Sequence, residues 1–292
     1  MSCPLCQSEH TEPFAAYPRH SLMLCSRCDF MYQTNQEQLH IQSLVSEIYN
    51  DEWIHMREKY TQSTFLDHAL FNTLLLDMFT PRKGTLLEIG SGTAEFLYTA
   101  QSAGWKVTGI EPSVVSCQYA YKKYGLSLIQ GIWHRDLKQE LEPFDAIALW
   151  HVLEHMPHPV DLLIELREIL KPDGFLFISI PNKNSFTNET LGARSPLYTE
   201  YDHLYHYSDQ SLRLLLELAG YTVKSLFSRQ LPNGLEQLIQ ANPNYDMHTF
   251  EETMSLLTKL QAQQRGHELC CVVQKTTLPH GNNEDCEGVS NP

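Results

Sequence analysis

The chain has 292 residues, of which 42% are hydrophobic and 19% charged, as is ordinary for a folded protein. Its formal net charge of -14 argues against a large nucleic-acid footprint, because such surfaces need an excess of basic side chains. No run of 18 apolar residues predicts a membrane span, and the opening MSCPLC lacks the apolar core of a signal peptide. We therefore expect a cytoplasmic protein whose eight cysteines are thiols or metal ligands rather than disulfides.

Two Cys-x-x-Cys pairs open the chain, and their members are Cys3, Cys6, Cys25 and Cys28. The gap between the pairs is long enough for a hairpin, and four thiolates at this spacing are typical of a tetrahedral structural zinc site. A metal would add folding free energy to a segment too short to bury a core of its own. Iron, two redox pairs or unligated thiols are the alternatives. The pattern predicts a zinc ribbon over residues 1–34.

The next elements follow from the spacing of apolar residues. Residues 35–80 are predicted to be helical, because FLDHALFNTLLLDMF places apolar side chains three and four residues apart. Four apolar runs then alternate with predicted helices at 94–103, 113–124 and 159–170: GTLLEIGSG, WKVTGIEPS, FDAIALW and GFLFISIPN. This alternation predicts an α/β fold, a parallel sheet with helices on both faces.

The last third continues this pattern with one interruption. A helix is predicted at 209–219, and two late strands at YTVKSLFS and ELCCVVQK. Between these strands we expect an insertion at 232–265. The α/β domain would thus occupy 81–275, and the polar residues 276–292 are predicted to be a disordered tail.

The stretch LLEIGSGTAEFL is the strongest chemical signal. Gly90 and Gly92 let the backbone turn sharply after a buried strand and approach a ligand closely. Glu88 lies inside the strand, and Glu111 closes the next strand about twenty residues later, where a carboxylate can accept both hydroxyls of a ribose. The pattern predicts a cofactor containing a nucleoside, with a dinucleotide as the alternative.

LLEIGSGTAEFL, VTGIEPS, FDAIALWHVLEHMPHP and LREILKPDGFLFISIPN together resemble the class I S-adenosylmethionine-dependent methyltransferases, near the ubiquinone-type and sugar methyltransferases. The resemblance covers about residues 40–275. It implies a Rossmann-like, seven-stranded, mostly parallel sheet and S-adenosylmethionine as cofactor. Many relatives carry a third glycine where this chain has Ala94, which would widen the packing between helix and strand slightly. The cofactor-binding residues that it implies, with Glu88 added, are Gly90, Ser91 and Gly92 under the methionine part, Glu111 at the ribose, Pro112, Gln130, Gly131 and Ile132 at the adenine, and Leu149, Trp150 and His151 on the methionine side.

The first candidate catalytic cluster is WHVLEHMPHP, at the carboxyl edge of the predicted sheet. On a helix His151, Glu154 and His155 share one face, because they are three and four residues apart. Imidazole and carboxylate groups are both metal ligands, so a metal site is compatible with this cluster. The alternative is a hydrogen-bonded element that caps the turn. His151, nearest to the cofactor, is one candidate for the proton acceptor.

The second cluster, YTEYDHLYHYSDQSL at 198–212, resembles the Glu-His-Leu-x-Tyr-Phe-Ser stretch of sugar methyltransferases. Asp202 stands at their glutamate, and His203 matches their histidine, the proposed base of C-methylating members. An acceptor must lose a proton as it attacks the methyl group, and an imidazole suits this task. The alternative for His203 is a buried histidine bonded to Asp202 or to the backbone. Four tyrosines are predicted to bind the substrate or to exclude water: Tyr198, Tyr201, Tyr205 and Tyr207.

We therefore expect a methyltransferase that acts on a small molecule: a sugar, a nucleotide-linked sugar or a natural-product intermediate. The reaction would be in-line O- or C-methylation in which positioning supplies most of the rate. The alternatives are an RNA methyltransferase that uses the ribbon to contact RNA, and a binding protein without turnover. The first 30 residues carry two arginines against three acidic residues, too few cations for many phosphate contacts. The ribbon is thus expected to act as a flap near a small-molecule pocket. The oligomeric state is left open, a homodimer included.

Overall fold

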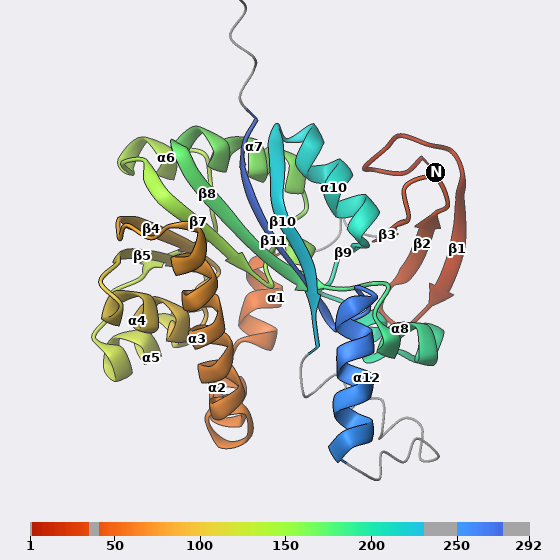
Figure 1. Cartoon of the computed structure of the whole chain (residues 1–292), viewed down its shortest axis with the longest axis horizontal. Coiled ribbons are helices and arrows are strands. Elements are labelled where there is room, and N and C mark those ends of the chain that lie inside the picture. Colours follow the sequence, from red (N-terminus) through yellow and green to blue (C-terminus); the bar gives the residue numbers. More distant parts are fainter. Residues whose placement is uncertain (1, 35–40, 231–249, 277–292) are drawn as a thin grey trace, which may run out of the picture.

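The computed structural model describes residues 2–34, 41–230 and 250–276, and its strands form two sheets (Figure 1). The larger sheet has seven strands in the order β10-β11-β8-β7-β4-β5-β6. Strands β4 to β8 pair in parallel, whereas β11 runs antiparallel between β8 and β10. The predicted Rossmann-like, seven-stranded, mostly parallel sheet is confirmed. The strands are β4 (Thr85–Ile89), β5 (Lys106–Glu111), β6 (Ile129–Gln130), β7 (Phe144–Trp150), β8 (Leu170–Pro181), β10 (Tyr221–Arg229) and β11 (Glu268–Lys275).

Helices cover both faces of this sheet because successive strand side chains point to opposite sides. Leu86 of β4 packs with α3 (Gln62–Phe79) and α4 (Glu95–Ser102), whereas its neighbour Leu87 belongs to a core that includes α7 (Pro159–Ile169) and α10 (Asp209–Leu218). Both leucines are fully buried, and burying one such side chain contributes about 1.5–3 kcal/mol. The two faces of the sheet therefore pack against two different hydrophobic cores.

The smaller sheet belongs to the N-terminal ribbon. Strands β1 (Thr11–Ala16), β2 (Ser21–Cys25) and β3 (Phe30–Gln33) form an antiparallel meander, and its fourth strand is β9 (Tyr205–His206). Tyr32 pairs with Tyr205, far along the chain. The ribbon lies beside α10 and α8 (Phe186–Leu191) in Figure 1. Because it shares a strand with the rest of the chain, the ribbon is not an isolated appendage. The predicted boundaries at 34, 80 and 275 stay predictions.

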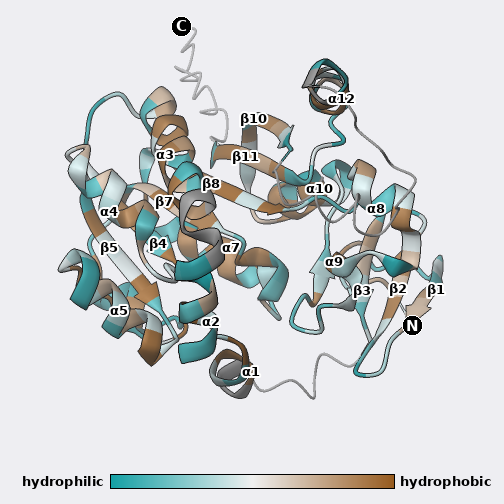
Figure 2. Cartoon of the chain, turned by 90° about the horizontal axis from the view of Figure 1, so that it is seen from below, coloured by the Kyte–Doolittle hydropathy of each residue, from teal (hydrophilic) through white to brown (hydrophobic). Residues whose placement is uncertain are grey.

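The predicted helical segment contains α1 (Ile41–Ile48), α2 (Asp51–Met56), a π-helical turn at Arg57–Thr61, and α3. The Asn50 side chain accepts a hydrogen bond from the Trp53 N–H at 3.0 Å and so caps α2. The Ser113 hydroxyl donates to the Tyr49 carbonyl at 2.9 Å, which ties the α1–α2 corner to the end of β5. Apolar colour covers much of α3 in Figure 2, and Leu66, Leu70, Leu74 and Met78 stay exposed at four-residue intervals.

Three predicted boundaries differ from the structure. The helix expected at 94–103 begins at Glu95, because Ala94 adopts a left-handed φ of 67°. The helix expected at 159–170 ends at Ile169, and β8 begins at Leu170, four residues before the predicted GFLFISIPN. Of the expected insertion, α12 (Phe250–Ala262) is helical, while 231–249 lie outside the described residues, as do 277–292.

The remaining elements are short. Among the described residues no helix has the length and apolar character needed to cross a membrane. The short helices are α5 (Val114–Tyr124), α6 (Leu137–Glu140), α9 (Pro196–Thr199) and the 3-10 turns Leu153–His155 and Gly192–Arg194.

Candidate active site

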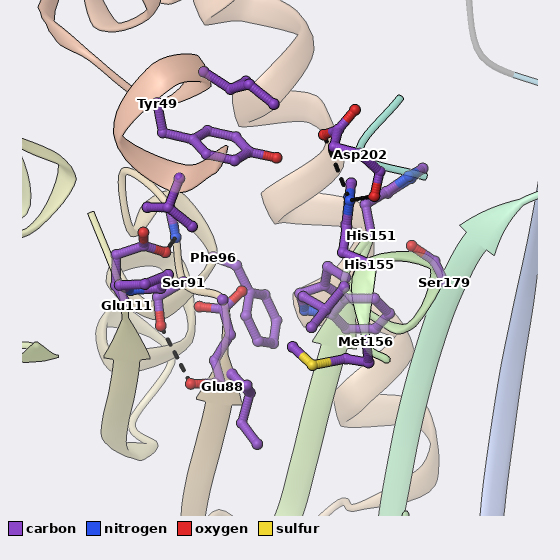
Figure 3. A pocket seen from close by; sticks show the side chains of 18 of the residues that line it. Tyr49, Glu88, Ser91, Phe96, Glu111, His151, His155, Met156, Ser179 and Asp202 are labelled. Carbon is purple, nitrogen blue, oxygen red and sulfur yellow. Dashed lines mark hydrogen bonds and ion pairs between the residues drawn. The ribbon is translucent and has the colours of Figure 1, made fainter. Parts of the chain in front are cut away.

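A cavity of about 720 Å³ lies at the carboxyl ends of β4, β5 and β7, and residues of α1, α2 and α3 also line it. In Figure 3, Glu88, Ser91 and Glu111 lie on one side of the cavity, and His151, His155 and Asp202 lie on the other. Ligands of open parallel α/β sheets bind at this edge. The cavity therefore has a glycine-loop side and a histidine-rich side.

On the glycine-loop side, the Glu111 carboxylate accepts hydrogen bonds from the backbone N–H groups of Gly92 at 2.8 Å and Ser113 at 2.7 Å. A Cβ atom added to Gly92 would meet no atom within 4 Å, so open space lies above this residue. A Cβ atom on Gly90 would come within 2.6 Å of the Val152 side chain. Gly92 thus allows a ligand to approach, whereas Gly90 allows the turn to pack.

Several buried polar atoms that line the cavity have no hydrogen-bond partner among the described residues. Buried polar groups are normally paired, so their concentration at one cavity indicates a polar ligand. Burial, with smaller contributions from Glu95 and Glu111, raises the pKa of Glu88 well above its usual value and favours its neutral form. These atoms are Glu88 Oε2, Asn72 Oδ1, His68 Nε2, Trp150 Nε1 and His267 Nδ1.

Most of the predicted cofactor residues line this cavity. Two do not: the Leu149 side chain is fully buried in the core on the α7 face of the sheet, and Gln130 is exposed. Ala94 is fully buried with a left-handed backbone, so a glycine here would serve the backbone conformation rather than packing distance. The predicted residues that line the cavity are Glu88, Gly90, Ser91, Gly92, Glu111, Pro112, Gly131, Ile132, Trp150 and His151.

His151 lies between two carboxylates, with its Nε2 2.8 Å from Glu268 and its Nδ1 3.4 Å from Glu154. Burial alone would lower the pKa of His151, but these two carboxylates outweigh it and raise the pKa to about 10. Arg229 also donates to Glu268. His151 is therefore an imidazolium at neutral pH and has no lone pair with which to accept a proton.

The expected helical face of His151, Glu154 and His155 is absent, because only Leu153–His155 forms a 3-10 turn and His151 has a left-handed φ of 54°. Instead, the structure brings Glu154 and His155 to His203, with one ligand atom of each within 4.8 Å of the others. Two imidazoles and one carboxylate could hold a divalent cation.

His203 is buried, and its Nδ1 lies 3.0 Å from Glu200 Oε2. Burial, with the neighbouring histidines, lowers the pKa of His203 well below its usual value, so the ring is neutral. Burial and the charges of Asp202 and Glu154 raise the pKa of Glu200 to about 7. The alternative for His203, a buried ring bonded to Asp202 or to the backbone, is met at the backbone, where His203 has a hydrogen bond with Leu197. Asp202 is instead the partner of His155, whose Nδ1 bonds the Asp202 carbonyl at 2.9 Å and lies 3.5 Å from its carboxylate.

The predicted substrate tyrosines do not line the cavity. Tyr205 and Tyr198 donate their hydroxyl groups to backbone carbonyls, and Tyr207 is fully buried. The Tyr201 ring lies 3.5 Å below the Arg19 guanidinium. These four side chains therefore contact other protein groups outside the cavity lining and do not face a ligand.

The four ribbon cysteines lie together, with Sγ–Sγ distances of 3.7 Å for Cys3 and Cys28 and 3.6 Å for Cys6 and Cys25. All four sulfurs lie within 4.8 Å of one another. Zinc–thiolate bonds of about 2.3 Å give a tetrahedron with edges of about 3.8 Å, so the cluster fits a zinc ion and is too open for disulfides. Burial raises the pKa of Cys3 to about 11, which disfavours a thiolate without a cation.

Several lining residues were not predicted from the sequence. Tyr49, Trp53, Arg57 and Phe65 reach the cavity from the N-terminal helices, and Arg229 reaches it from β10. Glu268 does not line the cavity but contacts His151, and it could have been suspected, because an acidic residue opens the otherwise apolar strand ELCCVVQK. The aromatic side chains give no such signal, since they are equally typical of a helix packed on a core.

Comparisons with known proteins agree with this geometry. A protein-family model described as "Methyltransferase domain" matches residues 56–226. A ubiquinone biosynthesis O-methyltransferase of Actinobacillus pleuropneumoniae serotype 5b is 30% identical over 128 residues, which are 39% of this chain and 55% of that protein. A tRNA U34 carboxymethyltransferase of Azotobacter vinelandii is 31% identical over 100 residues, which are 32% of this chain and 31% of that protein.

This chain thus spans about half of the first relative and about a third of the second. Among solved structures, a SAM dependent methyltransferase from Archaeoglobus fulgidus aligns with a TM-score of 0.53 and 15% identity, over 77% of this chain and 100% of that one. Since the family match extends over more than half of the 292 residues, the chain belongs to the methyltransferase-domain family, with the fold of the class I S-adenosylmethionine-dependent methyltransferases.

Proposed function

We propose that the protein transfers a methyl group from S-adenosylmethionine to a small hydroxylated or acidic C–H acceptor. The observation that carries this proposal is a single cavity with two chemically different sides. The hydrogen bond from the Gly92 N–H to the Glu111 carboxylate lies on one side, and His203 with the nearby Glu200 lies on the other. One side suits a nucleoside cofactor, and the other suits a group that must lose a proton.

The cofactor would be held by this chain's glycine loop and its acidic strand end. When bound, S-adenosylmethionine supplies an electrophilic methyl group on its sulfonium. Glu111 would accept hydrogen bonds from the ribose hydroxyls, since two backbone N–H groups already fix its orientation. Gly92 would let the loop lie against the methionine part, and Gly131 and Ile132 would flank the adenine.

His203 is the proposed proton acceptor. Its lowered pKa keeps the ring unprotonated at neutral pH, although it also weakens the base. The Glu200 carboxylate 3.0 Å away would stabilise the imidazolium that forms, because an opposite charge favours the charged ring. His151 is not proposed as the base, since it already holds its proton between Glu268 and Glu154.

A small acceptor is favoured over RNA by the walls of the cavity. Tyr49, Trp53, Phe65 and Leu197 provide apolar surface around the polar groups, as is common for small-molecule pockets. The net charge of -14 does not favour a polyanion. We also propose that Cys3, Cys6, Cys25 and Cys28 hold a structural zinc ion, which leaves no open coordination position for catalysis.

Release of S-adenosylhomocysteine tests the proposal. Purified protein is incubated with labelled S-adenosylmethionine and panels of sugars, nucleotide-linked sugars and phenols, and the products are identified by mass spectrometry. We expect turnover with at least one panel and its loss in His203→Asn. RNA is tested in parallel, and label transfer to RNA together with RNA binding that weakens as salt rises would instead support the RNA alternative. Cofactor binding with no transfer to any panel would support a binding protein.

A further inference from the structure

The N-terminal ribbon supports the histidine-rich side of the cavity through segment 198–208, which is called the wall below. The cavity lining begins at Leu44, so the described ribbon residues 2–34 do not line it. Gln33, at the end of β3, is 2% exposed, and its side-chain amide donates to the carbonyls of Tyr201 at 2.9 Å and His203 at 2.8 Å. Its backbone N–H donates to the Leu204 carbonyl at 2.9 Å. One buried glutamine thus fixes three neighbouring carbonyls of the wall.

The same wall is continuous with the thiolate cluster. Phe30 stacks on Tyr205 with ring centroids 5.2 Å apart, and both lie in one hydrophobic core with Cys3, Cys25 and Cys28. Strand β3, which carries Phe30 and Gln33, begins two residues after Cys28. A change in the packing of the cysteines would therefore be transmitted to β9 through a short, buried path.

A second set of hydrogen bonds between the ribbon and the rest of the chain starts at Asp29, directly after Cys28. Its carboxylate bonds Lys183 Nζ at 2.7 Å and Asn184 Nδ2 at 2.9 Å, and its carbonyl accepts from the Ser208 hydroxyl at 3.3 Å. His20 bonds the Tyr198 carbonyl at 2.9 Å. The segment 198–208 is thus held by the ribbon near both of its ends as well as at Gln33.

The glycine-loop side of the cavity is held differently. Its hydrogen bonds join Gly92, Glu111 and Ser113 to one another and Ser113 to Tyr49. The hydrogen bonds described from the ribbon to the rest of the chain end at the exposed Glu47 and on residues 183–210. The buried hydrogen bonds of the ribbon therefore go to the histidine-rich side, whereas its bond to α1, from Arg19 to Glu47, lies at the exposed surface.

We infer that Gln33 is a positioning residue, which fixes His203 for proton acceptance and makes the ribbon the rear support of the acceptor site rather than a docking module. This inference rests on the proposed function, because it assigns the acceptor to the wall that Gln33 holds. Gln33 acts through the backbone of 201–204 and does not touch the acceptor. Its loss should leave cofactor binding intact and impair the acceptor step.

Gln33→Met tests this role, because methionine keeps the length of the side chain and removes both donors. The matched control is Gln101→Met on the exposed surface of α4. Three quantities are measured on the full chain: the zinc content, the Kd for S-adenosylhomocysteine, and the imidazole signals of His203 by NMR with labelled histidine. Where an acceptor is known, kcat and KM are measured as well.

We expect one zinc per chain and a Kd within about twofold of wild type in both variants. In Gln33→Met the His203 signals should shift or broaden, and kcat/KM for the acceptor should fall at least tenfold; Gln101→Met should change neither. Unchanged His203 signals and kcat/KM would overturn the inference, as would an equal loss of cofactor affinity. If wild type methylates no acceptor while Gln33→Met still moves the His203 signals, the proposed function fails and the positioning role stands.

Discussion

The Glu111 carboxylate accepts a hydrogen bond from the Gly92 backbone N–H at 2.8 Å, so the end of β5 is clasped to the glycine loop that follows β4. Glu111→Gln should weaken this clasp, because an amide has one acceptor oxygen where the carboxylate has two. A hydrogen bond to a charged group contributes about 1.5–3 kcal/mol, so we expect S-adenosylhomocysteine affinity to fall roughly 10- to 100-fold by calorimetry. Glu140→Gln, on the exposed end of α6, is the control, and equal affinities in both variants would contradict the assignment.

Two of the cavity histidines, His203 and His151, should behave differently when replaced. His203→Asn removes the proposed base, and we expect methyl transfer to fall by about 10²–10⁴, the usual contribution of general base catalysis, with cofactor affinity unchanged. His151→Asn should retain more activity, because His151 already holds its proton. Initial rates under saturating cofactor decide between them. A larger loss in His151→Asn than in His203→Asn would reverse the assignment.

The ion pair of His151 and Glu268 should make stability depend on pH. The folded pKa of His151, about 10, exceeds the ordinary value of about 6.5, so the folded state binds one more proton between these values. The stabilisation is fully present below pH 6.5 or so and is lost as the pH rises through about 10. Although burial opposes it, His151 with Arg229 lowers the pKa of Glu268 to about 2, so that carboxylate stays charged across this range.

Urea denaturation at pH 7 and pH 9 measures this effect. The free energy of unfolding should decrease from pH 7 to pH 9 in wild type, and the decrease should be smaller in His151→Asn. His134→Asn, at an exposed site, serves as the control and should keep the wild-type decrease. The same pH dependence in all three proteins would show that other groups cause it.

Ala94 should tolerate glycine better than another buried alanine of the same region. Its left-handed φ costs an alanine roughly 1–2 kcal/mol, which glycine avoids while losing a buried methyl group and gaining freedom in the unfolded chain. These effects nearly cancel, so Ala94→Gly should change the free energy of unfolding by less than about 1 kcal/mol. Ala100→Gly, inside α4, should cost about 2 kcal/mol. Equal losses would mean that Ala94 bears no backbone strain.

Metal removal should act on one side of the cavity only. After treatment with a zinc chelator, hydrogen exchange should increase in 198–208, because the ribbon that supports this segment loses its cross-link. Exchange in 86–97 and the affinity for S-adenosylhomocysteine should change little. Cys25→Ser should reproduce the pattern without a chelator. Uniform loss of protection in both segments would indicate that the ribbon stabilises the whole chain.

The parts of the site that follow one another along the chain could be predicted from the sequence. The strand, glycine turn and helix at 85–102 form a local unit, and Glu111 lies at the end of the adjacent strand. The paired cysteines were also informative, because Cys-x-x-Cys spacing fixes where two thiolates can meet. In both cases the chemistry depends on short stretches whose geometry follows from residue type.

The contacts of the histidine-rich side could not be predicted in the same way. His151 meets Glu268 only because β11 inserts antiparallel beside β8, and His203 meets Glu154 and His155 because β9 pairs with the ribbon. The expectation of a helical face failed because a 3-10 turn and a left-handed residue replaced it. Such contacts depend on strand order and register, which spacing along the sequence does not encode.

The pairing of β3 with β9 has a consequence during synthesis. Gln33 leaves the ribosome about 170 residues before His203, and the four ribbon cysteines leave before Gln33. At ~5–20 residues per second, the edge of β3 stays without its partner for roughly 10 to 30 s. An unpaired edge strand attracts other chains, so early metal capture would keep the nascent ribbon folded while its last strand is still being made. Zinc supply during translation, and not only in the finished protein, would then determine how much of it folds.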